Sequence, residues 1–491
     1  MSVPPVAHDG QDVRTPFFMD KIEKNRKTSN SSAWYKRANL DDNPSRLSGI
    51  IVVLLCAILV FSNIAFGAVE TWAVGFLSLF AGAIVIFWIA DALIKKELWV
   101  SFSKLQLPLL GLILIGLIQL LPLRSSNISS DLLSIPAANS LSLDPYLTKL
   151  AIVQLIIYFI FFAAALTFIN IQSRLRKIVV SIVIFGASMA FFGILQRLAG
   201  VEGIYGLRPS PNAVPFASFV NQHHFAAFME MTIGLTLGLI FGKATDKDKR
   251  FLLLIAAVLM GIAIVMTSSR GGMLSLFGVL IFVIVANLLK KQKDENKSSI
   301  ENRQNYRRNF TIIAGGLALI LSLFGAVILL GGDASLLRGV GLTTTQDISS
   351  GRTHFWYVAL QIILNHPILG AGLDAFGTAF TRFDTWNGTF RVEQAHNDYL
   401  QILADAGVLG FACVASFIYL LFKNSLHAVG DALNRFRRNA AIGALAGCFG
   451  VLIHSFFDFP LRTPANAFFF LTFVVLATNS ISNPSLHRRR E

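Results

Sequence analysis

A series of apolar runs, each long enough to cross a lipid bilayer as an α-helix, dominates the sequence. A transmembrane helix needs about 20 consecutive, mostly apolar residues. Twelve segments meet this requirement when the sequence is scanned in windows of about 19 residues. Only 14% of the 491 residues are charged, whereas soluble globular proteins carry about 25%. The chain is therefore predicted to be an all-α polytopic membrane protein of about 12 transmembrane helices.

Polar segments of very different length separate the predicted spans. The expected organisation is a polar N-terminal tail (1–47), nine spans in 48–331, a large loop (332–407), three spans in 408–482 and a basic C-terminal tail (483–491). The tenth span is short and is expected to begin as early as Tyr399. The individual spans are expected at residues 48–66, 72–94, 107–123, 147–170, 177–196, 221–242, 251–267, 272–289, 310–331, 408–422, 439–457 and 464–482.

The distribution of basic residues predicts the orientation of these spans. The chain has 42 Lys and Arg against 28 Asp and Glu, a formal net charge of +14. In a membrane protein such an excess is first explained by the collection of basic residues in cytoplasmic loops, so no nucleic-acid partner is predicted. With twelve spans and a cytoplasmic N-terminal tail, 32 of the 42 basic residues fall in cytoplasmic segments. Both termini are therefore predicted to be cytoplasmic, and loop 332–407 lies on the outer side.

The ten basic residues on the predicted outer side are nine arginines and Lys149. A guanidinium group is planar, keeps its charge and binds phosphate with two parallel hydrogen bonds. These arginines are interpreted either as contacts to anionic lipid headgroups or as parts of a binding site for a phosphorylated ligand.

Three polar clusters on the predicted outer side contain the candidate site residues. Thr267–Gly272 is a tight turn between two spans, in which Arg270 and backbone N–H groups at a helix N-terminus can hold an anion. Ser350–Trp356 contains Arg352 and opens a short amphipathic helix, which the turn Asn365-His366-Pro367 ends. The third cluster follows at the end of the large loop.

Glu393–Leu400 (EQAHNDYL) is the third cluster and contains His396 at the predicted boundary between membrane and water. A general base at this boundary can meet both a lipid-linked donor and an acceptor on the water side. His396 is therefore a candidate catalytic residue.

The order and spacing of these clusters resemble the O-antigen ligase family. His396-Asn397, followed after nine residues by Gly407-x-x-Gly410, is similar to the signature of that family. Arg270-x-x-x-Leu274 is similar to its other short motif, and the stretch from Gly351 to Gly372 resembles the start of its large periplasmic loop. The matching segments lie within residues 270–410, in the order of the family.

The resemblance implies an inner-membrane glycosyltransferase of the GT-C type with its active site on the periplasmic side. Members take a glycan from undecaprenyl diphosphate; ligases attach it to lipid A-core, and Wzy-type polymerases attach it to another lipid-linked repeat unit. The resemblance further implies that His396 is the catalytic base and that Arg270 and Arg352 bind the diphosphate. It implies neither a metal ion nor another cofactor.

The chemistry of glycan transfer agrees with these roles. Displacing a sugar from a diphosphate requires stabilisation of the negative charge on the leaving group, and two arginines can provide it in place of a metal. The acceptor hydroxyl loses its proton during the attack, and a histidine that accepts it typically contributes about 10²–10⁴-fold to the rate.

Further polar residues near the outer ends of spans are candidates for lining a substrate cleft. His224 and its neighbour His223 point about 100° apart on a helix, so they are not expected to share a metal ion. His454 and Asp458 are four residues apart, either as a structural pair or as cleft residues. Glu230 lies deeper in its span, where a carboxylate is either functional or paired with a polar neighbour. The predicted cleft residues are Arg391, Asn397, His224, His454, Asp458 and Arg462.

A transporter or flippase is the alternative from another functional class. Twelve-span transporters usually show a repeat of six spans and polar residues near the bilayer midplane. Here no repeat is visible, and the polar residues cluster at the outer ends of the spans. Within the enzyme interpretation, a ligase and a polymerase remain alternatives because both use the same donor chemistry.

Overall fold

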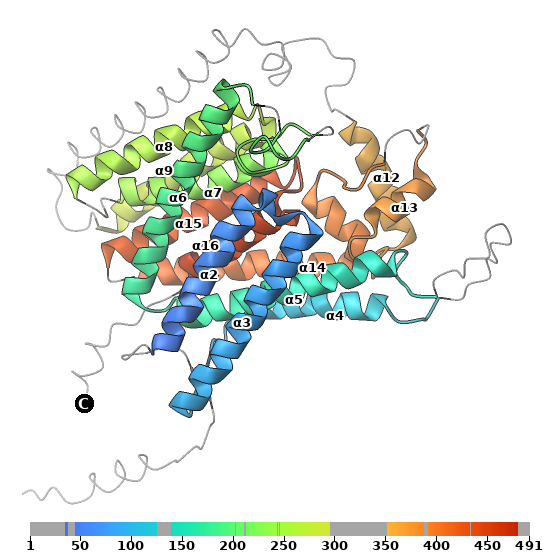
Figure 1. Cartoon of the computed structure of the whole chain (residues 1–491), viewed down its shortest axis with the longest axis horizontal. Coiled ribbons are helices and arrows are strands. Elements are labelled where there is room, and N and C mark those ends of the chain that lie inside the picture. Colours follow the sequence, from blue (N-terminus) through green and yellow to red (C-terminus); the bar gives the residue numbers. More distant parts are fainter. Residues whose placement is uncertain are drawn as a thin grey trace, which may run out of the picture.

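Eleven of the twelve predicted spans correspond to helices in the computed structural model (Figure 1). Among the described residues, nine helices of at least 18 residues are apolar enough to cross a membrane, and two further apolar helices are shorter. The twelfth predicted span, 310–331, lies outside the described residues, as do most of the N-terminal tail and the loop up to residue 350. The structure describes residues 35–37, 45–124, 139–201, 203–210, 213–242, 244, 246–294, 351–386, 391–432 and 434–479.

The helices that correspond to the predicted spans make up most of the described chain. The other elements are two helices before α14, two 3-10 helices and one parallel strand pair, in which Tyr35 is opposite Leu98. The predicted all-α class is therefore confirmed. The span helices are α2 (Arg46–Ile64), α3 (Thr71–Lys95), α4 (Gln106–Gln119), α5 (Pro145–Phe168), α6 (Gln172–Leu198), α7 (Gln222–Phe241), α8 (Lys247–Met266), α9 (Arg270–Asp294), α14 (Asp398–Asp431), α15 (Arg435–His454) and α16 (Pro464–Thr478). The others are α12 (Arg352–Asn365), α13 (Phe376–Phe383), η2 (Phe66–Ala68), η4 (Pro460–Arg462), β1 (Tyr35–Arg37) and β2 (Leu98–Val100).

The outside of the bundle is apolar along its spans. On α3, Leu79, Ile86 and Leu93 are 70%, 66% and 73% exposed. A soluble protein rarely exposes such a continuous apolar face, whereas lipid covers it without cost. The chain is therefore a multi-pass membrane protein, as its hydropathy predicts.

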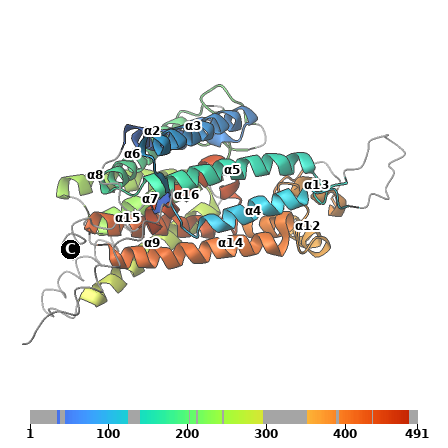
Figure 2. The same cartoon turned by 90° about the horizontal axis from the view of Figure 1, so that it is seen from below.

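Helix α7 lies at the centre of the bundle, with 94% of its most apolar 18-residue window buried (Figures 1 and 2). It packs on α15 through glycines, because a Cβ atom on Gly234 would lie 2.7 Å from the amide nitrogen of Gly447. Small residues allow such close approach of two membrane helices, which makes van der Waals packing effective in lipid. This rigid pair carries His224 and Glu230 on one helix and His454 on the other.

Helix α14 is interrupted at Gly407, which has φ 64° and ψ −163°. A Cβ atom there would lie 2.7 Å from the amide nitrogen of Leu369, so both the conformation and the contact require glycine. The predicted start of the tenth span at residue 408 falls at this break, and the helix itself begins at Asp398, next to the alternative start at Tyr399.

One end of the bundle carries α12 and α13 together with the start of α14 (Figures 1 and 2). The turns at 65–70, 267–269 and 455–463 lie at the same end, which we call the loop end. Helix α12 covers the amphipathic helix predicted over 353–364, ends at the predicted turn, and buries Val358 and Ile362 against α13. The loop end therefore has a small core of its own beside the membrane spans.

Candidate active site

His396 and Asp458 meet at the loop end although 62 residues separate them in the chain. Nδ1 of His396 lies 3.1 Å from Oδ1 of Asp458, which also accepts a hydrogen bond of 2.9 Å from the backbone N–H of Phe459. His396 has a positive φ of 50° and directly precedes Asn397, the N-cap of α14. A non-glycine residue in this region of φ is uncommon and often marks a functional site.

Several hydrogen bonds tie the segment that carries His396 to the turn that carries Asp458, among them one from the Ser455 hydroxyl to Oδ2 of Asp398 at 2.8 Å. The Asn397 side chain caps α14 by accepting from the N–H groups of Tyr399 and Leu400, and its Nδ2 donates to the carbonyl of Phe456 at 3.1 Å. The backbone N–H of Asp398 donates to the carbonyl of Ser455 at 2.9 Å. The separation of His396 and Asp458 is therefore fixed by backbone hydrogen bonds as well as by their own contact.

Asp458 is a buried carboxylate beside one guanidinium group and several imidazoles. Its side chain is 2% exposed, and Nη2 of Arg352 lies 3.7 Å from Oδ2. Burial alone would raise the pKa of Asp458, but the hydrogen bond to His396 and the nearby imidazoles of His223, His396 and His224 hold that pKa well below its ordinary value. Asp458 is therefore ionised throughout the physiological range of pH.

Two aromatic rings enclose the imidazole of His396. Phe355 is stacked at a centroid distance of 5.8 Å, and Phe459 contacts it edge-on at 4.8 Å. The side chain of His396 is nonetheless 29% exposed. Because Phe355 lies one turn after Arg352 on α12, that helix supplies both an aromatic wall and a guanidinium group to the same site.

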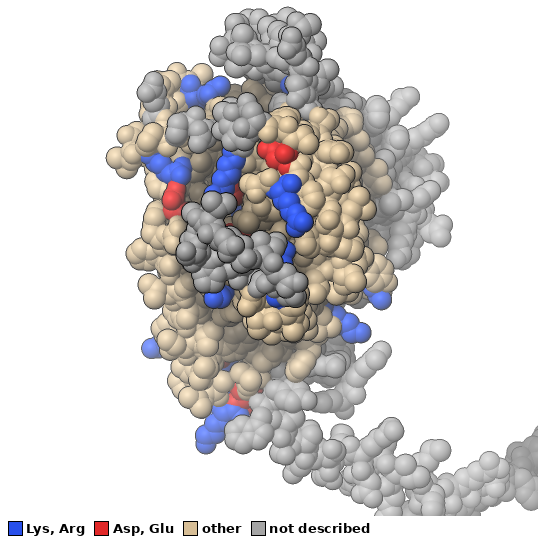
Figure 3. Space-filling model, turned by 90° about the vertical axis from the view of Figure 1, so that its right-hand side faces the viewer, with Lys and Arg blue, Asp and Glu red and all other residues tan. Residues whose placement is uncertain are grey.

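Arg270 is the first residue of α9 and is exposed. A Cβ atom on the next residue, Gly271, would lie 2.9 Å from the His454 ring and 3.2 Å from Cβ of Phe457. The start of α9 therefore packs against the turn that continues to Asp458. Figure 3 looks onto this end of the molecule, where basic side chains (blue) lie around a hollowed region.

Glu230 and His454 form a buried pair one layer deeper in the bundle. Nδ1 of His454 lies 2.8 Å from Oε1 of Glu230, and the two side chains are 1% and 0% exposed. His454 is thus the partner that the sequence left unnamed for Glu230. Since α15 ends at His454, Asp458 follows in the next turn and faces His396.

The remaining predicted cleft residues lie in different surroundings. His224 is buried, with Nδ1 2.7 Å from Oγ1 of Thr463. Arg391 is 65% exposed and pairs with Glu393 at 2.5 Å. Arg462 does not contact His396, but pairs with Asp374 and Asp405. These three residues stay predictions as cleft residues, and the structure places them at separate points of the loop end.

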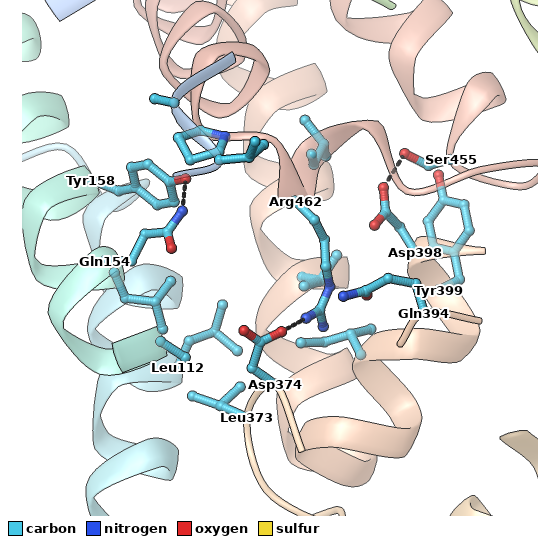
Figure 4. A pocket seen from close by; sticks show the side chains of 18 of the residues that line it. Leu112, Gln154, Tyr158, Leu373, Asp374, Gln394, Asp398, Tyr399, Ser455 and Arg462 are labelled. Carbon is cyan, nitrogen blue, oxygen red and sulfur yellow. Dashed lines mark hydrogen bonds and ion pairs between the residues drawn. The ribbon is translucent and has the colours of Figure 1, made fainter. Parts of the chain in front are cut away.

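Arg462 lines a cavity of about 420 Å³ between α3, α4, α5, α14 and η4 (Figure 4). The lining includes Gln394 and Asp398, which flank His396 in the chain, but not His396 itself. Burial would lower the pKa of Arg462, but Asp405, Asp374 and Asp398 raise it above its ordinary value, so the guanidinium stays charged. This cavity is therefore separate from the surroundings of His396.

A second histidine–carboxylate pair lies next to the site. Nε2 of His354 lies 2.8 Å from Oδ1 of Asp384, and its ring is stacked on Trp386 at 4.2 Å. Hydrogen bonds from the Trp386 N–H and from His354 lower the pKa of Asp384. Trp386 is 47% exposed and contacts Phe355 edge-on at a centroid distance of 5.9 Å, so an aromatic surface extends outward from His396.

Several contributors to these arrangements have no signal in the sequence. Asp374 and Asp405 carry the ion pairs of Arg462, and Phe355 and Phe459 enclose His396, but none of them belongs to a motif that predicts these contacts. Within the described residues, no group of three or more His, Cys, Asp and Glu side chains is placed to hold a metal ion.

Comparison with protein families gives one match. The model of the O-antigen ligase family matches residues 255–415, which include Arg270, Arg352 and His396. No curated protein matches the chain at a significant level. Residues 255–415 are therefore similar to the O-antigen ligase domain.

Proposed function

We propose that the protein transfers a glycan from undecaprenyl diphosphate to an acceptor hydroxyl at the loop end, on the periplasmic side of the bacterial inner membrane. The pairing of His396 with the buried carboxylate of Asp458, beside Arg352, carries this proposal. His396 and Arg352 lie inside the matched residues 255–415. The acceptor is proposed to be lipid A-core or a similar glycan, and no metal ion or cofactor takes part.

His396 acts in this scheme as the general base. If Nδ1–H donates to Asp458, the second ring nitrogen, Nε2, carries a free lone pair that can accept the proton of the acceptor hydroxyl. The oxygen then attacks the anomeric carbon of the donor sugar, and the bond from that carbon to the phosphate oxygen breaks. The negative carboxylate of Asp458 stabilises the imidazolium that forms, and undecaprenyl diphosphate leaves.

Arg270 and Arg352 stabilise the leaving diphosphate. They begin α9 and α12, so each guanidinium charge is added to the positive end of a helix dipole. Preorganised charge of this kind supplies the stabilisation that a metal ion provides in other glycosyltransferases. Arg352 is 25% exposed and pairs with Asp458 at 3.7 Å, a distance that leaves its other nitrogens for a phosphate.

A Wzy-type polymerase would use the same donor site, with a second lipid-linked repeat unit as the acceptor. Deletion of the gene followed by analysis of the cell's glycans separates the alternatives. A ligase is indicated if polymer accumulates on undecaprenyl diphosphate without being attached, and a polymerase if single repeat units accumulate. Unchanged glycans, or substrate movement across the membrane that survives His396→Ala, would contradict the proposed function and favour a transporter or flippase.

A further inference from the structure

The cavity beside Arg462 is a half-open space at the loop end, and the proposed transfer reaction does not use it. Its volume of about 420 Å³ lies in the range of small-molecule sites, about 300–1,000 Å³. Segment 394–398 separates it from the imidazole of His396, because Gln394 and Asp398 face the cavity while His396 contacts Phe355, Asp458 and Phe459. The cavity can therefore hold a ligand while the site around His396 is occupied.

The charged residues that line the cavity disfavour the binding of an anion. Its single guanidinium, that of Arg462, is already bound by Asp374 and Asp405, and the lining adds the carboxylate of Asp398 (Figure 4). The three carboxylates outnumber the one cation, so a phosphate would be repelled. This distinguishes the cavity from the surroundings of Arg270 and Arg352.

The same polar groups can form hydrogen bonds with the hydroxyl groups of a ligand. Asp374 is 40% exposed and carries oxygens that accept from O–H groups, Arg462 donates, and Gln394 can do both. Oε1 of Gln394 has no hydrogen-bond partner in the described part of the chain. Tyr158 and Tyr399 also line the space, and their aromatic faces offer apolar contact to the C–H groups of a sugar ring.

The opposite side of the cavity is apolar and belongs to membrane spans. Val74 of α3, Leu112 of α4, Leu155 of α5 and Val414 of α14 line it. A ligand that fills the whole cavity therefore has a hydroxyl-rich part at the loop end and a hydrocarbon part directed along the spans.

We propose that this cavity binds an uncharged sugar unit of a membrane glycolipid, and that this glycolipid is the acceptor. The identification as acceptor rests on the proposed function, whereas binding of the sugar does not. Gln394 and Asp398 each lie two residues from His396, so an occupied cavity contacts both ends of the segment that presents the base.

Protection of an engineered cysteine tests the proposal without any activity measurement. Val69 is 44% exposed at the rim of the cavity, and Val69→Cys is made with the three native cysteines Cys56, Cys413 and Cys448 replaced by Ala. The full-length protein in nanodiscs is labelled with a maleimide in the presence of hexyl β-glucoside, hexyl phosphate or hexylammonium. Ile368→Cys, 62% exposed at the same end and outside the cavity, is the matched control.

Hexyl β-glucoside is expected to slow labelling at Val69→Cys about tenfold at ten times its Kd, because occupancy reduces the free fraction in that proportion. Hexyl phosphate should protect Val69→Cys from labelling only slightly. Ile368→Cys should be labelled at the same rate with each of the three compounds. Asp374→Asn and the filling substitution Ala151→Phe should each abolish the protection. Equal or better protection by hexyl phosphate or hexylammonium, or none by the glucoside, would overturn the sugar site.

The His396→Ala variant separates this proposal from the proposed function. Protection by hexyl β-glucoside should persist in it, because His396 does not line the cavity. In transfer assays, Ala151→Phe should raise the KM for the acceptor at least about tenfold, the effect of losing 1.4 kcal/mol of binding, with donor binding unchanged. Protection with no effect on acceptor KM would overturn the assignment as acceptor and leave the sugar site standing.

Discussion

Asp458 faces His396 across a distance of 3.1 Å, with a hydrogen bond from the backbone of Phe459 holding the same carboxylate oxygen. The carboxylate is thus fixed by its own chain before it contacts the imidazole. This is the arrangement that selects one tautomer of a histidine and stabilises its charged form.

Asp458→Asn should reduce turnover with little change in fold. The amide keeps the shape of the carboxylate but loses the charge that stabilises the imidazolium, so kcat is expected to fall by about 10²–10⁴-fold. The KM for the donor should change much less, and steady-state transfer assays at saturating acceptor measure both. A kcat within twofold of the wild type would show that Asp458 does not act on His396.

Asp458 should also make stability depend on pH in one direction. Its pKa is lowered in the folded state, so the carboxylate stabilises the fold above its ordinary unfolded pKa of about 3.9 and this contribution is lost as the pH falls below that value. Thermal unfolding of wild type and Asp458→Asn should therefore differ between pH 5 and 8, and the two curves should converge in acid. A difference that grows with acidity would contradict this account.

Lysine should not replace arginine functionally at the proposed diphosphate site. Arg270→Lys and Arg352→Lys keep the charge but lose the planar fork that binds two phosphate oxygens. We expect the donor kcat/KM to fall by about tenfold to a hundredfold, the equivalent of about 1.5–3 kcal/mol for hydrogen bonds to charged groups. Arg197→Lys, at an exposed arginine in the last turn of α6, is the control and should leave kcat/KM unchanged.

Glu230→Ala should destabilise the bundle strongly. It leaves His454 buried without its partner, and breaking a buried pair in this way costs about 3–5 kcal/mol. Chemical unfolding in mixed micelles measures the loss. Asp246→Ala is the control, because it removes the exposed ion pair with Lys249. A surface ion pair of this kind contributes about 0–1 kcal/mol to stability. Equal effects of the two substitutions would show that the Glu230–His454 contact contributes nothing.

Gly407→Ala should disrupt the junction between the loop end and α14. The residue has a positive φ, and an added Cβ would strike the backbone of Ile368 and Leu369. A strained backbone of this kind costs about 1–3 kcal/mol before the clash is added. Gly430→Ala, in the same helix with no atom near the added Cβ, should be neutral or stabilising. Similar melting temperatures for both variants would contradict the observed break.

The spans and the helix α12 could be predicted because each depends on a local pattern. Runs of about 20 apolar residues set the spans, and the turn at Asn365-His366-Pro367 ends α12 where the sequence indicates it. The start of the tenth span is ambiguous in the sequence, at residue 408 or as early as Tyr399, whereas the observed helix begins at Asp398 and is interrupted at Gly407. There the tertiary contacts of Asn397 and Asp398 with the turn at 455–458 decide the structure.

The contacts across the site could not be predicted in the same way. His396 and Arg352 stand in motifs, but the pairing of His396 with Asp458 and of Glu230 with His454 joins segments 62 and 224 residues apart. The spacing of His454 and Asp458 would place both on one helix face, as a structural pair or as cleft residues, but α15 ends at His454. The cavity beside Arg462 is lined by residues from many separate elements, so no local sequence pattern indicates it.

In the proposed function, His396 accepts the proton of the acceptor hydroxyl. The most direct measurement is single-turnover transfer by His396→Ala in nanodiscs loaded with undecaprenyl-diphosphate-linked glycan, with donor binding measured separately. His427→Ala, at an exposed histidine far along α14, is the control and should match the wild type. We expect a rate about 10²–10⁴-fold lower for His396→Ala, with donor binding retained. Near-wild-type transfer by His396→Ala would contradict this role of His396.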